Sequence, residues 1–178
     1  MGAAGPNGRA GHTFRRNLLW QVRAIVPIGF ANAFSARSII VTANHPDHIL
    51  EIINPGCQQL VGYRTLVDTR DGSCEVLLDL NPNHLNGLGL LHGGIVATLL
   101  DVACGNTAAS FFDRETHPSL VTVSLNTTYI AAAKSGRVSA TAKATGGGRS
   151  IAYVNGELRD EDGVLLATAT GVFKRVRR

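Results

Sequence analysis

Residues 86–112 read NGLGLLHGGIVATLLDVACGNTAASFF, and this stretch decides the fold. Its first residues are rich in glycine and indicate a loop, whereas those from Gly94 to Phe112 are mostly small or apolar and contain no proline. The second part is too long for a buried strand and predicts a helix of about 19 residues, entered at His92 and Gly93. No other long helix is predicted, so the remaining elements must pack against this one.

Strand-like runs lie on both sides of the predicted helix. A hairpin around Arg70-Asp71-Gly72 precedes it, and four runs joined by glycine-containing turns follow it. Because no strand–helix–strand unit recurs, this order indicates an α+β fold in which an antiparallel sheet of about five or six strands wraps one long central helix. The expected strands are residues 63–67, 74–80, 120–130, 137–144, 151–158 and 164–176.

The N-terminal part of the chain differs from the rest. The length of 178 residues favours one domain with additional sequence at one end. Residues 1–46 contain five arginines and no acid, and we interpret them as a basic extension of a domain that covers residues 47–178. The apolar positions between residues 49 and 53 have the spacing of one helix face, so we expect a helical piece between His48 and Tyr63, broken at Pro55.

Three interpretations of the N-terminal extension remain open. Its apolar stretch, residues 18–34, is interrupted by Gln21 and Arg23, which argues against the unbroken core of a secretory signal. An arginine-rich segment without acids is also typical of organellar transit peptides. The third interpretation is a tail or short surface helix on a cytoplasmic protein, which is the location we expect. Because no run of 18 apolar residues occurs, we expect no membrane span.

The net charge of +4 does not indicate a nucleic-acid partner once the charges are placed along the chain. The excess of cations lies in residues 1–46 and at the C-terminus, whereas residues 47–173 contain eight cations and 13 acids. A folded surface of that sign does not match a phosphate backbone, so we expect no nucleic-acid binding. The three cysteines form no CxxC pair, and neither a zinc site nor a disulfide framework is expected.

The predicted helix has two different faces. At 100° per residue, five apolar side chains fall on one side, which we expect a sheet to cover: Val96, Leu99, Leu100, Val102 and Ala103. The opposite side holds a single acid, Asp101, among small residues: Gly94, Ala97, Thr98, Gly105 and Ala108. Small side chains allow close approach, so this side is expected to meet a partner subunit. Asp101 is then either an ordinary exposed acid or a half-buried carboxylate that is able to activate a water.

His92-Gly93-Gly94 marks the point where loop becomes helix. The first N–H groups of a helix have no partner inside it, and the helix dipole favours negative charge there. The two glycines allow a substrate carbonyl to approach these amides, and His92 is able to cap the terminus, position a neighbour or transfer a proton. The simpler interpretation is a flexible helix entry with a structural histidine.

The spacing of these residues resembles the active-site signature of the hot-dog-fold acyl-CoA thioesterases. The matching pattern is N-x-x-G-x-x-H-G-G from Asn86 to Gly94, followed by Asp101, nine residues after the histidine. The resemblance is to the phenylacetate-pathway (PaaI-like) branch of the 4-hydroxybenzoyl-CoA thioesterase superfamily. It extends over about residues 57–174, through Val121–Tyr129 and Gly148–Tyr153, and leaves the N-terminal extension unexplained.

The resemblance implies a role for each matching residue. The Gly93 amide, with help from the Asn86 side chain, would polarise a thioester carbonyl, and Asp101 from a neighbouring subunit would activate or orient the attacking water. Thr122 would supply a hydroxyl near that acid, and His92 would support the same terminus. The implied assembly is a homodimer with active sites at the interface, often paired into a homotetramer, that takes acyl-CoA as substrate. No metal or redox cofactor is implied, because CoA is part of the substrate.

Further residues concern substrate binding. The turn at Gly148-Arg149-Ser150 resembles the place where a basic or hydroxyl residue meets the pantetheine or phosphates of CoA. Arg149 and Ser150 are therefore candidate substrate contacts, together with Gly94 at the helix start, and a solvated turn is the alternative for Arg149. Four histidines are expected at the surface: His45, His48, His84 and His117.

Two other functions remain open beside the thioesterase. A hot-dog dehydratase or hydratase would share the fold, but it resembles this chain in fold only, because its pattern of histidine and acid is not found here. A non-catalytic acyl-CoA-binding module would also share the fold, although residues 1–46 contain no convincing pair of helices for a DNA-binding regulator. We therefore expect an enzyme, an acyl-CoA thioesterase that releases a free acid and CoA, and the sequence does not decide its acyl group.

Overall fold

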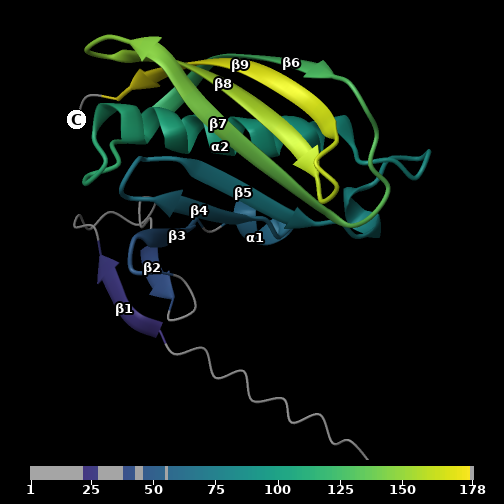
Figure 1. The fold of residues 1–178 in the computed structure, drawn as a ribbon, viewed down its shortest axis with the longest axis horizontal. Helices are drawn as coiled ribbons and strands as arrows, with labels where there is room; N and C mark the ends of the chain where they lie inside the picture. The colour runs from purple at the N-terminus through teal and green to yellow at the C-terminus, as the bar shows by residue number, and fades with distance from the viewer. Residues whose placement is uncertain (1–21, 28–37, 43–45, 55, 177–178) are drawn as a thin grey trace, which may run out of the picture.

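A computed structural model describes residues 22–27, 38–42, 46–54 and 56–176, the first two ranges as backbone only. One long helix, α2 (Gly93–Phe112), lies inside a single curved antiparallel sheet (Figure 1). The α+β order and the hot-dog arrangement expected from the sequence are confirmed. The six predicted runs are all strands: β4 (Arg64–Asp68), β5 (Cys74–Asp79), β6 (Leu120–Tyr129), β7 (Arg137–Gly147), β8 (Ile151–Asp160) and β9 (Leu165–Arg175).

Within the described residues the sheet has more strands than expected, nine in the order β1-β2-β3-β4-β5-β7-β8-β9-β6. The additional ones are β1 (Val22–Pro27), β2 (Ser38–Thr42) and β3 (Ile49–Ile53). The helical piece predicted at β3 is wrong, because the segment between His48 and Pro55 is too short to repay helix nucleation and its isoleucines favour a strand paired with β4. A short helix, α1 (Cys57–Val61), follows.

Strands β1 and β2 lie within the basic extension. They form an antiparallel pair that joins the main sheet through β3. The surface helix considered for residues 18–34 therefore does not extend through residues 22–27. The domain boundary at residue 46 stays a prediction, and so do the transit-peptide and export interpretations, which depend largely on residues 1–21, outside the described residues.

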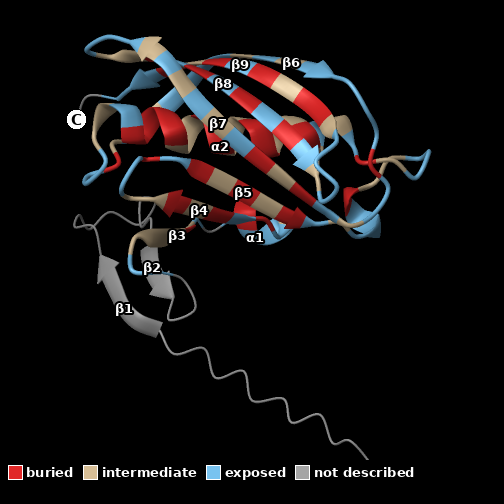
Figure 2. Cartoon of the chain, viewed as in Figure 1, coloured by how far each residue is buried: buried red, intermediate tan, exposed pale blue. Residues whose placement is uncertain are grey.

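The hydrophobic core lies between α2 and the sheet, as the band of buried residues in Figure 2 shows. Leu99 and Leu100 of α2 are fully buried against Val76 of β5 and Val138 of β7. Complete burial of one such side chain contributes about 1.5–3 kcal/mol, so this contact anchors the N-terminal half of the helix. A second cluster around the C-terminal half consists of Cys104, Ala108, Ala152, Val154 and Phe173.

The two faces of α2 differ from the predicted ones at two positions. Val102, expected in the core, is half-buried and lines a pocket, whereas Ala108, expected on the partner side, is fully buried. Ala108 is covered by Ala152 and Val154 of β8 and by Phe173 of β9. The sheet also approaches α2 very closely at Gly156. A Cβ atom at Gly156 would lie only 2.7 Å from the Cys104 Sγ atom.

Among the described helices, α2 alone is long and apolar enough to cross a membrane, by length and composition only. Half of its most apolar window is buried within the protein. Its position inside the sheet therefore accounts for its apolar composition.

Strand β6 forms one edge of the sheet. It pairs with β9 along its whole length, and no described strand pairs with its other edge. Apolar side chains are nevertheless exposed along it, with Val123 57% and Tyr129 56% exposed. A ten-residue edge strand of this kind is a ready surface for pairing with another chain.

Candidate active site

The loop that leads into α2 is held in a fixed, hairpin-like form. A 3-10 turn, η1 (Pro82–His84), precedes it, and the His92 N–H donates to the His84 carbonyl over 2.9 Å. An isolated bridge joins Leu85 to Leu91. These pairings connect Asn86 and the first turn of α2 through one short, ordered segment.

His84 fastens this loop to the rest of the protein. Its Nδ1 accepts a hydrogen bond from the Asn81 N–H at 3.1 Å, and its Nε2 donates to the Val61 carbonyl at 2.8 Å. The prediction of a surface position is wrong for His84 and also for His117, because both are buried. His48 is half-buried, with its Nε2 3.7 Å from a carboxylate oxygen of Asp68, and His45 lies outside the described residues.

The first turn of α2 presents one amide that is already paired and one that is not. His92 is the N-cap, and its Nδ1 accepts a hydrogen bond from the Gly94 N–H at 2.9 Å. The capping role considered for His92 is therefore present, and its Nε2 carries the proton. Within the described part of the chain, the Gly93 N–H has no hydrogen-bond partner. The Gly93 amide is thus the free donor at this helix terminus, whereas the Gly94 amide is occupied.

Tyr129 of β6 packs over the same terminus. Its hydroxyl donates to the Gly93 carbonyl at 3.1 Å, and a Cβ atom at Gly93 would lie 3.3 Å from the tyrosine ring. A larger residue at position 93 would crowd this ring. The sequence alone does not indicate this role for Tyr129, because no local spacing connects a strand residue to a helix start 36 positions away.

Asn86 is oriented by its own loop. Its Oδ1 accepts hydrogen bonds from the Leu88 N–H at 2.9 Å and the Leu90 N–H at 3.2 Å. These bonds determine which end of the amide faces the loop backbone. No described residue accepts a hydrogen bond from the Asn86 Nδ2, which is left as a donor. This arrangement suits a group that donates to a substrate carbonyl.

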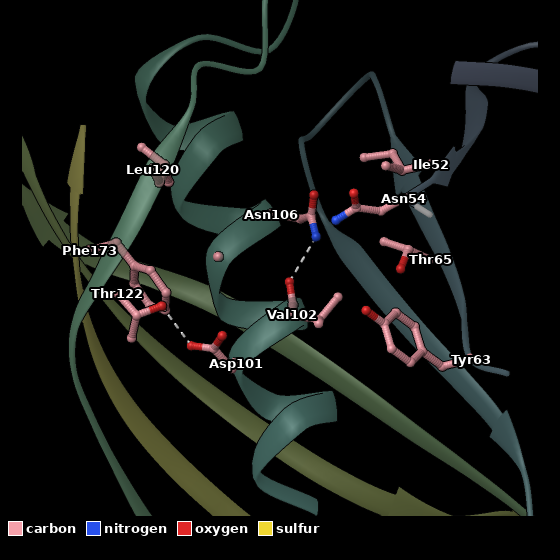
Figure 3. Close-up of a pocket in the computed structure, with 11 residues that line it drawn as sticks. Ile52, Asn54, Tyr63, Thr65, Asp101, Val102, Asn106, Leu120, Thr122 and Phe173 are labelled. Carbon is pink, nitrogen blue, oxygen red and sulfur yellow. Dashed lines mark hydrogen bonds between the residues drawn. The ribbon is translucent and has the colours of Figure 1, made fainter. Parts of the chain in front are cut away.

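Asp101 and Thr122 are in direct contact, as Figure 3 shows. The Thr122 hydroxyl donates to Asp101 Oδ1 at 2.8 Å, and no described side chain hydrogen-bonds to Oδ2. The pair borders a pocket of about 170 Å³ between α2 and the β3–β4 side of the sheet. Its lining residues are Ile52, Asn54, Tyr63, Thr65, Asp101, Val102, Gly105, Asn106, Leu120, Thr122 and Phe173.

The acid and the free amide are well separated within one chain. Asp101 lies eight residues beyond Gly93 on the same helix, which corresponds to about 12 Å along the helix axis at 1.5 Å per residue. One carbonyl cannot accept a hydrogen bond from Gly93 while a water held by the same chain's Asp101 attacks it, because both groups must lie within about 3 Å of the reacting atoms.

The predicted CoA contacts lie at the other end of α2. Arg149 and Ser150 occupy the turn between β7 and β8, and Arg149 is exposed. The preceding Gly147 lies against Phe111 in the last turn of the helix, where an added Cβ would be 2.7 Å from the phenyl ring. One chain therefore brings Asp101 together with Thr122, and Asn86 together with the helix start, but places Arg149 far from both.

Two buried groups near Asp101 stay protonated at neutral pH. Burial, with smaller contributions from Cys57 and Asp101, raises the pKa of Tyr63 to about 12. Burial, together with the Asp101 carboxylate, raises the pKa of the Cys104 thiol to about 12. Cys104 is therefore a poor nucleophile, because the thiolate is the reactive form. The carboxylate of Asp101 remains as the group that can accept a proton in this pocket.

Comparison with known proteins identifies the family to which this chain belongs. The model of the thioesterase superfamily matches residues 88–167, which include the first turn of α2 and Asp101. Human acyl-coenzyme A thioesterase 13 is 31% identical over 112 residues, covering 62% of this chain and 78% of that protein. The orthologue from Pongo abelii matches to the same extent.

Solved structures resemble the fold over a similar range. A Bacillus halodurans protein solved with CoA is 30% identical, with a TM-score of 0.61 over 68% of this chain and 78% of that one. A phenylacetic acid degradation-related protein from Ralstonia eutropha, described as a putative thioesterase, is 28% identical, with a TM-score of 0.59 over 68% of this chain and 91% of that one. The family resemblance inferred from the sequence is confirmed.

Proposed function

The chain belongs to the thioesterase superfamily and is a thioester hydrolase, and we propose that it hydrolyses acyl-CoA to a free acid and CoA at a site shared by two subunits. The observation that carries this proposal is the division of the catalytic groups along α2. A free amide and the Asn86 donor stand at one point of the helix, and the Asp101–Thr122 pair stands about 12 Å further on.

A homodimer would unite the two halves. If a second copy packs against the accessible small residues of α2, Asp101 of the partner subunit can approach the His92-Gly93 corner. The unpaired edge of β6 and its exposed apolar side chains support pairing between copies on the same side of the molecule. Two such dimers would form the tetramer that we regard as a further stage of assembly.

The proposed mechanism begins with carbonyl polarisation. The thioester oxygen accepts hydrogen bonds from the Gly93 N–H and the Asn86 Nδ2, where the positive end of the helix dipole also stabilises negative charge. His92 keeps the first turn of the helix in place through its bond to the Gly94 amide. Gly94 thereby supports the site through the cap, and contact between its own amide and the substrate would require His92 to move.

Water then attacks the polarised carbon. Asp101 of the partner subunit accepts a proton from the water through Oδ2, while Thr122 holds Oδ1. A carbon–oxygen bond forms, and the negative charge passes to the carbonyl oxygen. When the tetrahedral intermediate collapses, the carbon–oxygen double bond re-forms and the carbon–sulfur bond breaks. CoA leaves as a thiolate, and the proton on Asp101 neutralises the sulfur. We propose that the reaction uses no metal or redox cofactor.

Contacts with CoA are proposed at the β7–β8 turn. Arg149 is exposed and able to pair with a phosphate, and Ser150 follows it in the turn. This turn lies at the C-terminal end of α2. If the two α2 helices run antiparallel across the dimer, the turn would lie near the N-terminal end of the partner's helix and contact CoA bound at that active site. The same geometry would account for its distance from the amide donors of its own chain.

Replacement of the acid tests the mechanism. Asp101→Asn should lower kcat for acyl-CoA hydrolysis at least 100-fold, as expected for the loss of a general base, when release of free thiol is measured. Asp162→Asn is the matched control, because that acid lies in the exposed β8–β9 turn. Undiminished hydrolysis by the Asp101 variant would remove this residue from the mechanism. Binding of acyl-CoA by the wild type without thiol release would instead favour a non-catalytic module, and hydration of crotonyl-CoA would favour a hydratase.

A further inference from the structure

The pocket beside Asp101 has a polar end that the proposed hydrolysis does not use. Four uncharged polar side chains line it, and we call them the polar cluster: Asn54, Tyr63, Thr65 and Asn106. Figure 3 shows Asn54 and Asn106 pointing toward one another, and the Tyr63 hydroxyl pointing from the start of β4 toward α2. The cluster therefore faces the same space as the Asp101 carboxylate.

These side chains keep unused hydrogen-bonding capacity. The Asn106 Nδ2 donates to the Val102 carbonyl at 2.8 Å, which leaves its Oδ1 as a free acceptor. Among residues 46–54 and 56–176, no partner is found for the hydroxyls of Tyr63 and Thr65 or for the side-chain amide of Asn54. Tyr63 is 5% exposed and Thr65 is 2% exposed, and both line the pocket, where a ligand can replace the water that reaches them. A ligand that pairs with such groups should bind more tightly than an analogue that lacks the matching oxygen.

The chemistry of the cluster selects an uncharged ligand group. It contains hydroxyl donors and amide acceptors but no cation, so it does not match a carboxylate or a phosphate. The raised pKa of Tyr63, about 12 through burial, keeps its hydroxyl a donor at neutral pH. A hydroxyl or keto oxygen is the complementary group.

The size of the pocket limits the acyl group. Its volume of about 170 Å³ is close to that of a 150 Å³ protein cavity that holds benzene, which indicates space for about six to eight non-hydrogen atoms. A long fatty chain would extend beyond the part of the pocket that this chain builds.

We propose that the polar cluster binds a hydroxyl or keto oxygen on the acyl group, so that the preferred substrates are short, oxygenated acyl-CoA thioesters. This inference rests on the proposed hydrolysis, because it takes the Asp101 end of the pocket as the reacting end. A site that pairs with a substrate hydroxyl discriminates strongly against the analogue that lacks it, because the polar groups of the site are then left unpaired. We expect a preference of at least tenfold in kcat/KM.

A positional series tests the preference. Hexanoyl-CoA is compared with its 3-, 4-, 5- and 6-hydroxy derivatives by thiol release, and S-hexyl-CoA is compared with the corresponding hydroxyhexyl thioethers by calorimetric binding. At least one hydroxylated member should exceed its parent tenfold in both assays. Tyr63→Phe should lower that ratio to below threefold, whereas Tyr153→Phe, on the exposed side of β8, should leave it unchanged.

The thiol-release assay and the binding assay together separate this inference from the proposed function. If hexanoyl-CoA is hydrolysed as well as every hydroxylated member, the polar cluster does not select the substrate, although hydrolysis itself stands. If no thiol is released from any member, the proposed function fails, and the binding of the inert thioethers still decides whether the cluster recognises a hydroxyl. Equal binding of all the thioethers would overturn the inference. The wild-type comparison needs no variant, so a Tyr63→Phe protein that fails to fold leaves the test intact.

Discussion

Two inactive variants of this chain should restore activity when they are mixed, if each active site takes its acid from one subunit and its oxyanion donors from the other. The first variant is Asp101→Asn, which removes the proposed base. The second is Asn86→Asp, which removes the Nδ2 donor but keeps an oxygen that can accept from the Leu88 and Leu90 amides. Each variant alone should be impaired, because both sites of its homodimer contain the same defect.

The expected gain follows from the geometry. Loss of an oxyanion-hole donor lowers kcat by about 10²–10³-fold, and loss of a general base has an effect of about 10²–10⁴-fold. After complete exchange of equal amounts, about half of the dimers are mixed, and each mixed dimer has one intact site and one site with both defects. The mixture should therefore reach about a quarter of the wild-type rate, on the order of 25-fold above either variant alone.

Thiol release from an acyl-CoA measures this recovery, with the two variants coexpressed under different tags so that mixed dimers can be isolated. The matched control pairs Asp101→Asn with Thr122→Ala, which damages the same half-site. Those mixed dimers have a defect at every acid and should stay inactive. If the Asp101 and Asn86 pair also shows no recovery in isolated mixed dimers, the acid acts within its own subunit and the shared site is refuted.

Two further predictions concern packing and assembly. Gly156→Ala should lower the free energy of unfolding by about 1–3 kcal/mol in urea denaturation, because its Cβ would lie 2.7 Å from the Cys104 Sγ atom. Gly148→Ala, where an added Cβ meets nothing within 4 Å, should leave it nearly unchanged, and equal effects would contradict this account of the close approach. Val123→Lys on the β6 edge should shift the molecular mass measured by light scattering to that of the monomer and abolish hydrolysis. Thr170→Lys on the internal strand β9 should do neither, and a dimeric, active Val123 variant would exclude this edge from the interface.

Local patterns were sufficient to predict most of the fold. The long apolar run predicted α2 within one residue, and glycine-containing turns separated the four strands that follow it. β3 was mistaken for helix because five apolar-rich residues satisfy a helical spacing as well as a strand, and only pairing with β4 decides between them. The prediction for Ala108 is wrong for a related reason, because the residues that cover it, Ala152, Val154 and Phe173, lie on strands far away in the sequence.

The candidate site is likewise predictable from local sequence patterns only in part. The spacing in residues 86–101 was enough to predict a capped helix terminus and an acid, and the Thr122 contact followed from the family pattern. Nothing local connects Tyr63 with Asn106, because the polar cluster is assembled from β3, β4 and α2 only in three dimensions. The prediction of a surface position for His84 is wrong because its ring is held mainly by two backbone groups, the Asn81 N–H and the Val61 carbonyl, which no composition rule reveals.

The exposed edge of β6 and the divided active site are explained by the same assembly. A long edge strand with exposed valines is an aggregation hazard for a chain that stays alone, and proteins usually protect such strands with charges, prolines or bulges. β6 has one irregularity between Thr122 and Ser124 but no charged residue and no proline along its ten residues. Thr122, which holds the acid, and Tyr129, which packs over the free amide, both lie on this strand. Pairing at β6 would therefore protect the edge while it fixes both halves of the site relative to the interface. Selection for catalysis would then preserve an exposed strand that stability alone would disfavour.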